Sequence, residues 1–173
     1  MPPEKDMTTF DGGCHCGRLH IGFSTRLDPT SFTPRACDCS FCHKHGAAYV
    51  SDPAGQLSVS AREGALRRYR QGSGNADFLL CGECGVLVAV VFGHAGRLHG
   101  AVNVGCLEGN NEFMAPVPAS PRTLSAEEKI SRWLKLWIPD VELNASDDWP
   151  ASNFGGAVQA AKATIPDHRF AWH

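Results

Sequence analysis

Hydrophobic and polar positions alternate in short segments over the first two thirds of the chain. Leu19, Ile21 and Phe23 are separated by His20 and Gly22, and this period of two is typical of a strand with one buried face. Similar segments predict strands at residues 48–50, 57–59, 66–69, 77–80 and 98–104, and the β-branched residues of 86–92 predict a central strand. Glycine and proline separate these segments. We therefore expect a mainly β domain over residues 10–115.

The pattern changes after residue 115. A proline-containing connector is followed by Ser125 and Glu128, which have the spacing of a helix capping box. Apolar residues then recur at i, i+3, i+4 and i+7, the period of one helix face: Ile130, Trp133, Leu134 and Trp137. This predicts a helix near residues 125–138 within a C-terminal extension, 116–173. We expect its apolar stripe to pack on the sheet of the same domain, with a partner groove or a dimer contact as the alternative.

Asp147 to Pro150 suggest a turn, and residues 157–163 a second short helix.

Composition and charge limit the function classes. The chain has 173 residues, 43% of them hydrophobic, which suits one domain with a core. Its formal net charge of −2 argues against a nucleic-acid partner. No apolar run approaches the roughly 20 residues of a spanning helix, and the polar segment 1–10 resembles neither a signal nor a transit peptide. We expect a soluble, cytoplasmic protein with no membrane partner; the sequence carries no signal for its oligomeric state.

Eight cysteines stand out in such a protein. The cytosol keeps thiols reduced, so clustered cysteines there favour metal binding or redox chemistry over disulfides. Seven of them fall into three groups, and Cys106 stands apart. The groups are Cys14 with Cys16, then Cys37 with Cys39 and Cys42, then Cys81 with Cys84.

The first and third groups together supply four thiols. Glycines beside both pairs permit the backbone to turn, so that two thiols of one pair can reach one ion. Structural zinc prefers four thiolate or imidazole ligands in a tetrahedron. We therefore expect Cys14, Cys16, Cys81 and Cys84 to form a closed zinc site that joins the start of the domain to its central strand.

The second group supplies three thiols within six residues, Cys37, Cys39 and Cys42. Three protein ligands with an open position are typical of a catalytic zinc site. Three anionic sulfurs weaken the metal as a Lewis acid, whereas a thiol arriving as the fourth ligand would be deprotonated. The pattern favours thiol chemistry over hydrolysis and predicts two zinc ions per chain.

Other interpretations of the cysteines remain open. The second site could be closed by His43, His45 or Cys106, which would make both zinc ions structural. Two further alternatives are a redox dithiol, which would not require the extra C-x-C pairs, and an iron–sulfur cluster, whose ferredoxin-type spacing the sequence lacks. His43 and His45 are also candidates for an acid–base pair near the metal, and Cys106 for an extra ligand.

Four segments carry a recognisable pattern: GCHCG (13–17), CDCSFCHKHG (37–46), CGECG (81–85) and NVGCLE (103–108). They resemble the glutathione-dependent formaldehyde-activating enzymes, also called the centromere-protein-V family. The resemblance implies a β-tent zinc fold, with a structural zinc on Cys14, Cys16, Cys81 and Cys84 and a catalytic zinc on Cys37, Cys39 and Cys42. It also implies that the protein joins glutathione to formaldehyde.

Two features depart from that family's pattern. Asp38 stands where many members carry histidine, which adds a negative charge beside the open site and would disfavour an anionic substrate. The segment after about residue 116 matches nothing in the family and could cover the site.

The sequence as a whole predicts a zinc-dependent carbon–sulfur lyase or synthase. A small thiol resembling glutathione would add to formaldehyde or another small aldehyde, or the adduct would be cleaved, with His43 or His45 as the acid. Lys44, Arg67, Arg68 and Arg70 are candidate carboxylate ligands, although the three arginines suit an exposed strand edge better. The alternative function is a non-catalytic zinc module that binds a thiol metabolite or a protein partner.

Overall fold

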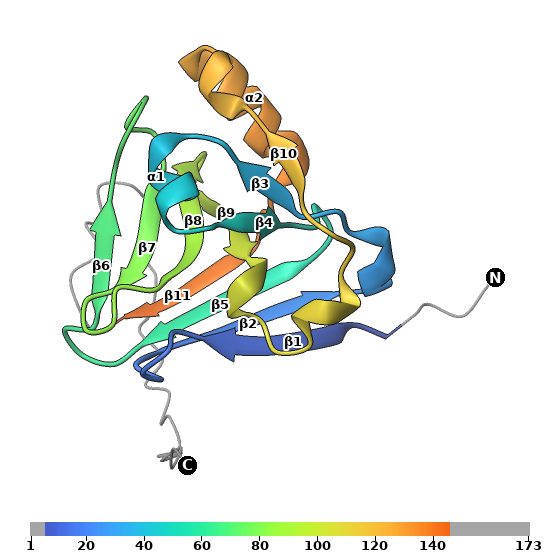
Figure 1. The fold of residues 1–173 in the computed structure, drawn as a ribbon, viewed down its shortest axis with the longest axis vertical. Helices are drawn as coiled ribbons and strands as arrows, with labels where there is room; N and C mark the ends of the chain where they lie inside the picture. The colour runs from blue at the N-terminus through green and yellow to red at the C-terminus, as the bar shows by residue number, and fades with distance from the viewer. Residues whose placement is uncertain (1–5, 146–173) are drawn as a thin grey trace.

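A computed structural model describes residues 6–145 of the chain. Two β-sheets form most of this part, with one longer helix above them (Figure 1). The smaller sheet has the strand order β1-β2-β5-β11. Its strands are β1 (Thr8–Gly13), β2 (Leu19–Thr25), β5 (Gln56–Ala61) and β11 (Val141–Ala145), of which β11 runs parallel to β5 while the other neighbours are antiparallel.

The larger sheet has the order β10-β3-β4-β9-β8-β7-β6. Its strands are β3 (Arg35–Cys37), β4 (Ala48–Val50), β6 (Leu66–Tyr69), β7 (Asp77–Cys81), β8 (Leu87–His94), β9 (Arg97–Asn103) and β10 (Val117–Ala119). The pair β10–β3 is parallel and the other pairs are antiparallel. The mainly β fold expected from the sequence is confirmed.

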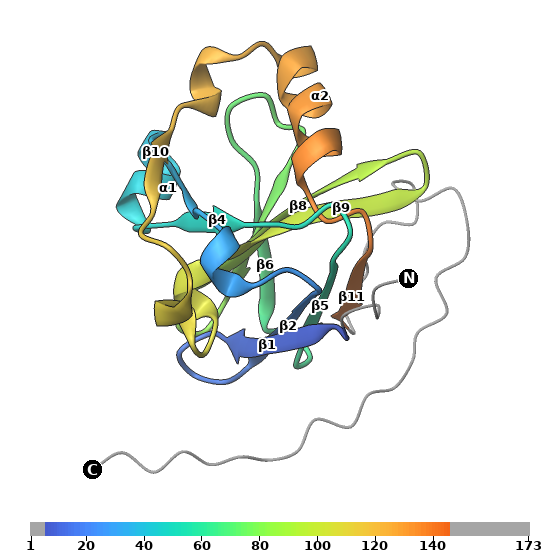
Figure 2. The ribbon, with the colours of Figure 1, turned by 90° about the vertical axis from the view of Figure 1, so that its right-hand side faces the viewer.

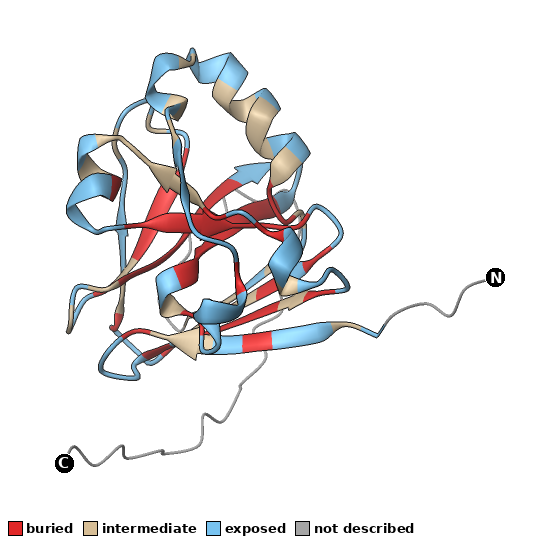
Figure 3. Ribbon diagram, turned by 45° about the vertical axis from the view of Figure 1, so that its right-hand side comes forward, coloured by how far each residue is buried: buried red, intermediate tan, exposed pale blue. Residues whose placement is uncertain are grey.

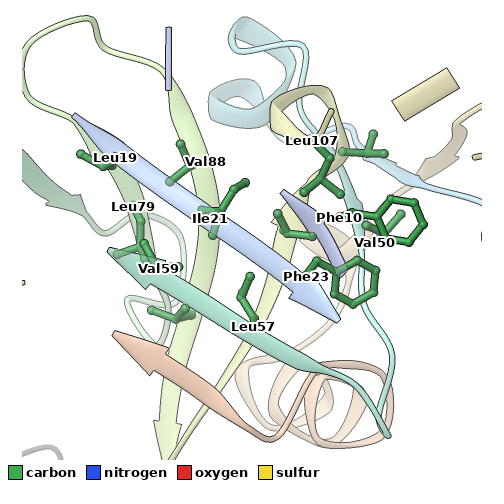
Figure 4. Packing of buried hydrophobic residues seen from close by; sticks show 14 of the residues in the cluster. Phe10, Leu19, Ile21, Phe23, Val50, Leu57, Val59, Leu79, Val88 and Leu107 are labelled. Carbon is green, nitrogen blue, oxygen red and sulfur yellow. The ribbon is translucent and has the colours of Figure 1, made fainter. Parts of the chain in front are cut away.

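The main core lies between the two sheets. Ile21 of β2 pairs in register with Val59 of β5, and Phe23 pairs with Leu57; all four are buried. Figure 4 shows these side chains on one face of their strands, close to Val88 of β8. Hydrophobic and polar residues therefore alternate in β2 because one face of the strand is covered and the other is exposed.

Strand β8 is buried on both faces. Val88 and Val91 belong to the core between the sheets, whereas Val90 and Phe92 belong to a second cluster on the opposite face. Figure 3 shows buried segments concentrated where the central strands cross the molecule. The β-branched segment that forms β8 is continuously apolar because both of its faces are covered.

Helix α2 (Ala126–Leu136) covers part of that opposite face. Ser125 accepts a hydrogen bond from the Glu128 backbone N–H, and the Glu128 carboxylate accepts one from Ser125 N, so the capping box is confirmed. Trp133 and Trp137 stack with ring centroids 4.8 Å apart and contact Phe92. The expected stripe packs on the sheet except at Leu134, which is 38% exposed; Leu136 packs there instead.

The C-terminal segment adds one strand to each sheet: β10 pairs with β3 in the larger sheet, and β11 pairs with β5 in the smaller one. In Figures 1 and 2, α2 lies at the end of the molecule opposite β1 and β2. No helix within residues 6–145 is long and apolar enough to cross a membrane. The turn expected at 147–150 and the helix expected at 157–163 lie outside the described residues.

Candidate metal centre

The first thiol cluster joins two turns that are far apart in the sequence. Cys14 and Cys16 lie between β1 and β2, Cys81 is the last residue of β7, and Cys84 lies in the turn before β8. Their four sulfur atoms lie within 4.8 Å of one another. The Cys16 and Cys81 sulfurs are 3.5 Å apart. The structure therefore brings together the four thiols that the sequence grouped.

The two turns have the same local design. Gly17 and Gly85 each follow a cysteine pair, and both have φ of +74°, a conformation that favours glycine. The backbone N–H of Gly17 donates to the Cys14 carbonyl, and that of Gly85 donates to the Cys81 carbonyl. Each turn thus directs two thiols toward the same point.

The second thiol cluster is local. Cys37 ends β3, Cys39 caps the short helix α1 (Ser40–Lys44), and Cys42 lies within that helix. Their sulfur atoms also lie within 4.8 Å of one another. The Cys39 sulfur accepts from the Cys42 backbone N–H over 3.4 Å, so the helix start itself fixes the spacing of these two residues.

Hydrogen bonding among these thiols favours a thiolate at Cys37. A bond with the Cys42 thiol lowers the pKa of Cys37 to about 6, against the opposing effect of burial. The same bond, together with burial, raises the pKa of Cys42. Burial and then the Cys42 charge raise the pKa of Tyr49, whose hydroxyl oxygen lies 3.4 Å from the Cys42 sulfur. The Tyr49 hydroxyl is therefore protonated at neutral pH.

Both donor sets fit zinc. Four thiols form the closed all-sulfur set of a structural site, and three thiols form the partial set of a site with an open position. The first cluster lies around a turn between strands, whereas all three cysteines of the second line a cavity of about 230 Å³. The second set is therefore placed to receive a ligand that enters this cavity.

The cavity beside the second cluster is both cationic and aromatic. Four basic side chains line it: Arg35, Arg122, Lys129 and Arg132. Phe78, Trp133 and Trp137 supply aromatic surface, and the Tyr49 hydroxyl lies near the cysteines. Among the described residues that line the cavity, none is acidic and none is histidine. This combination suits a ligand that carries both negative charge and apolar surface.

Asp38 does not line this cavity. Its carboxylate accepts a hydrogen bond from the Ser120 hydroxyl over 2.7 Å and forms an ion pair with Arg122. The Ser120 bond, followed by Arg122, lowers the pKa of Asp38. The negative charge of Asp38 is therefore paired with residues of the C-terminal segment. This pairing offsets the repulsion of an anionic substrate that we expected from the sequence.

The remaining residues singled out from the sequence lie away from the cavity. His43 and His45 are exposed at the end of α1, and the His45 ring contacts Phe41. The Cys106 thiol donates to the Leu87 carbonyl over 3.3 Å, and burial, then the Cys84 charge, raise its pKa to about 11. Cys106 thus lies on the side of the first cluster, and the geometry gives no support to a ligand role at the second.

The basic residues considered earlier are placed elsewhere too. Arg67 and Arg68 are exposed on β6, the last strand of the larger sheet, so the strand-edge interpretation is confirmed for these two arginines. Arg70 is bonded to Asp77, and Lys44 is exposed on α1. The basic residues of the cavity could not be recognised together from the sequence, because Arg35 and Arg132 are far apart in it. The available signal was that Lys129 and Arg132 lie three residues apart on the predicted helix.

The fold and the two thiol clusters define a mainly β protein with two candidate metal centres. The model of the family described as glutathione-dependent formaldehyde-activating enzyme matches residues 9–119. This is more than half of the chain, and the chain belongs to that family.

Among solved structures, the chain is similar to a crystal structure of a Rhodobacter sphaeroides protein. The two are 28% identical with a TM-score of 0.48, over 63% of this chain and 99% of the other. No curated protein matches the chain.

Proposed function

We propose that this protein is a zinc-dependent carbon–sulfur lyase or synthase, which joins a small thiol to formaldehyde or another small aldehyde or cleaves the adduct. The observation that supports this most is that Cys37, Cys39 and Cys42 line a cavity. Family membership supports chemistry of glutathione and formaldehyde.

Cys14, Cys16, Cys81 and Cys84 would hold a structural zinc ion, and Cys37, Cys39 and Cys42 a second one. Bound at the second site, zinc would supply the positive charge that keeps an entering thiol deprotonated at neutral pH. This fits the donor count, because three thiols leave one position of a tetrahedron to the substrate.

The cavity side chains would bind and orient the substrates. Lys129 and Arg132 are placed to bind carboxylate groups of the thiol, and Trp133 would exclude water from its apolar part. The substrate sulfur then attacks the aldehyde carbon, and the carbon–sulfur bond forms as the carbonyl π electrons move to oxygen. That oxygen takes a proton from solvent, and the reverse reaction returns thiol and aldehyde.

We assign the hydrogen-bond donor for the developing oxygen charge to Tyr49, in place of His43 and His45. Its hydroxyl lies at the cavity wall beside Cys42 and keeps its proton, because burial raises its pKa. A donor held in a partly dry site stabilises developing negative charge more strongly than water does. The two histidines are exposed on α1 and do not line the cavity.

A second candidate function is a zinc-bearing module that binds a thiol metabolite without turnover. It is favoured by the absence of histidine and carboxylate among the described cavity-lining residues, since these are the usual groups for proton transfer. The two functions make the same prediction for thiol binding and differ in the rate of adduct formation.

The rate of S-hydroxymethylglutathione formation from glutathione and formaldehyde distinguishes them. The zinc-loaded protein should raise this rate above the uncatalysed reaction, which is subtracted at each concentration. Cys39→Ser should abolish the increase and Cys106→Ser should preserve it. Thiol binding with no rate increase for any small aldehyde would rule out the enzyme and leave the binding module.

A further inference from the structure

Three of the basic side chains in the cavity lack an acidic partner. Within residues 6–145, no carboxylate forms an ion pair with Arg35, Lys129 or Arg132. The fourth, Arg122, is neutralised by Asp38. The three charges converge from two elements, since Arg35 belongs to β3 and the others to α2.

Arg35 is held in place by contacts that leave its charge uncompensated. Its Nη2 donates to the Ser51 hydroxyl over 2.6 Å, and that hydroxyl donates to the Leu136 carbonyl at the end of α2. Ser51 is buried and Arg35 is partly buried. A chain of hydrogen bonds therefore links β3 to the end of the helix that carries Arg132.

Bringing these cations together is unfavourable by itself. Arg35 lies close enough to Arg132 for mutual repulsion, and a partly buried charge without a partner is costly. Two guanidinium groups and an ammonium group around one space are the arrangement that recognises carboxylates. An entering dianion would offset both the repulsion and the loss of hydration.

We propose that Arg35, Lys129 and Arg132 form an anion subsite that selects thiols carrying two carboxylates and no ammonium group. The thiol part of this proposal rests on the function proposed above; the anion part does not. A substrate ammonium group would meet no acidic side chain among the described cavity-lining residues. A dicarboxylate thiol therefore binds more tightly than glutathione, which carries an ammonium group beside one of its two carboxylates.

Two of the three subsite cations come from the segment beyond the family match, and Arg35 lies within the match. That match ends at residue 119, whereas Lys129, Arg132, Trp133 and Trp137 follow it. The cysteine motif thus lies on the β domain, and α2 supplies Lys129 and Arg132 to the same cavity (Figure 2). Helix α2 therefore contributes, together with Arg35, to substrate choice in this chain.

Binding of four probes by isothermal titration calorimetry of the zinc-loaded protein at low salt tests the proposal. The probes are mercaptosuccinate, succinate, glutathione and 2-mercaptoethanol. Mercaptosuccinate should bind about tenfold or more tightly than 2-mercaptoethanol, because each charge-assisted bond adds affinity. Succinate should bind without a thiol and compete with mercaptosuccinate, and high salt should reduce both affinities.

Variants on α2 provide the matched comparison. Arg132→Gln should weaken mercaptosuccinate and succinate by about tenfold and leave 2-mercaptoethanol unchanged, with Arg132→Lys recovering part of the loss. Lys135→Gln removes an exposed charge from the same helix, outside the cavity, and should change nothing. Unchanged zinc content and melting temperature exclude misfolding as the cause.

Two results separate this proposal from the proposed function. Equal affinities for mercaptosuccinate and 2-mercaptoethanol, with no effect of Arg132→Gln, would overturn the anion subsite and leave a thiol-binding centre. Succinate binding that depends on Arg132, with no binding of 2-mercaptoethanol, would support the subsite and overturn the thiol-accepting centre.

Discussion

The Nε atom of Arg122 lies 3.1 Å from a carboxylate oxygen of Asp38. Asp38 stands between Cys37 and Cys39, whereas Arg122 belongs to the segment that leads into α2. The Asp38 backbone N–H also donates to the Ala119 carbonyl. The second cysteine cluster is therefore attached directly to the segment that brings the cavity cations into place.

Asp38→Asn should loosen this attachment. The ion pair with Arg122 is lost, while the Ser120 hydroxyl can still donate to the asparagine side chain, so we expect local opening without global unfolding. Trypsin should then cleave after Arg122 several-fold faster at neutral pH than in the unmodified protein. Glu127→Gln, which removes an exposed carboxylate from the first turn of α2, should leave the cleavage rate unchanged.

Ser125→Ala should destabilise α2. Its side chain accepts from the Glu128 N–H, and removal of such a cap lowers the free energy of unfolding by about 1 kcal/mol. Ser131→Ala, at an exposed position within the same helix, should be neutral or slightly stabilising because alanine favours helices. Denaturant unfolding curves measure both changes, and equal effects of the two variants would contradict the capping role.

Tyr49→Phe should slow adduct formation more than it weakens thiol binding. The variant removes the hydroxyl beside Cys42 and leaves the ring, so a fall in kcat/KM of about tenfold or more is expected from loss of a hydrogen-bond donor. Tyr69→Phe is the matched control, because Tyr69 is exposed and stacks on Phe41 outside the cavity. A full rate in Tyr49→Phe with unchanged zinc content would exclude Tyr49 as the donor.

Zinc-depleted protein should show selective alkylation. The pKa of Cys37 is lowered to about 6 by its bond with Cys42, so its thiolate predominates at neutral pH. Burial raises the pKa of Cys106 to about 11, which keeps that thiol protonated. Iodoacetamide should therefore modify Cys37 well before Cys106 at pH 7, as followed by peptide mass spectrometry. Zinc should protect Cys37, and faster labelling of Cys106 would contradict the assigned order.

Local pattern predicted much of the fold. Strand β2 alternates because only one face is buried, and β8 is rich in valine because both faces are covered. The segments that became β1, β3, β10 and β11 were missed. Pro118 lies inside β10, which is tolerated because this strand is the edge of its sheet. Strand β10 pairs with β3 and β11 pairs with β5, and both partners are distant in the sequence. No local period therefore indicates either strand.

The thiol clusters could be predicted because their spacing reflects local turns. Gly17 and Gly85 mark those turns directly in the sequence. The cavity was not predictable in this way, since Arg35 and Arg132 meet only after α2 packs over the larger sheet. Likewise, His43 and His45 lie beside Cys42 in the sequence but on the exposed end of α1. Closeness along the chain therefore did not indicate which side chains line the cavity, since Tyr49 lines it and the two histidines do not.

The central claim is that Cys37, Cys39 and Cys42 hold an open metal centre that accepts a thiol. Zinc content per chain, measured together with a calorimetric glutathione titration, tests it most directly. We predict two zinc ions, with Cys39→Ser losing one ion and all thiol binding, and Cys106→Ser retaining both. Two zinc ions with no response to any thiol, or thiol binding that survives Cys39→Ser, would contradict the claim.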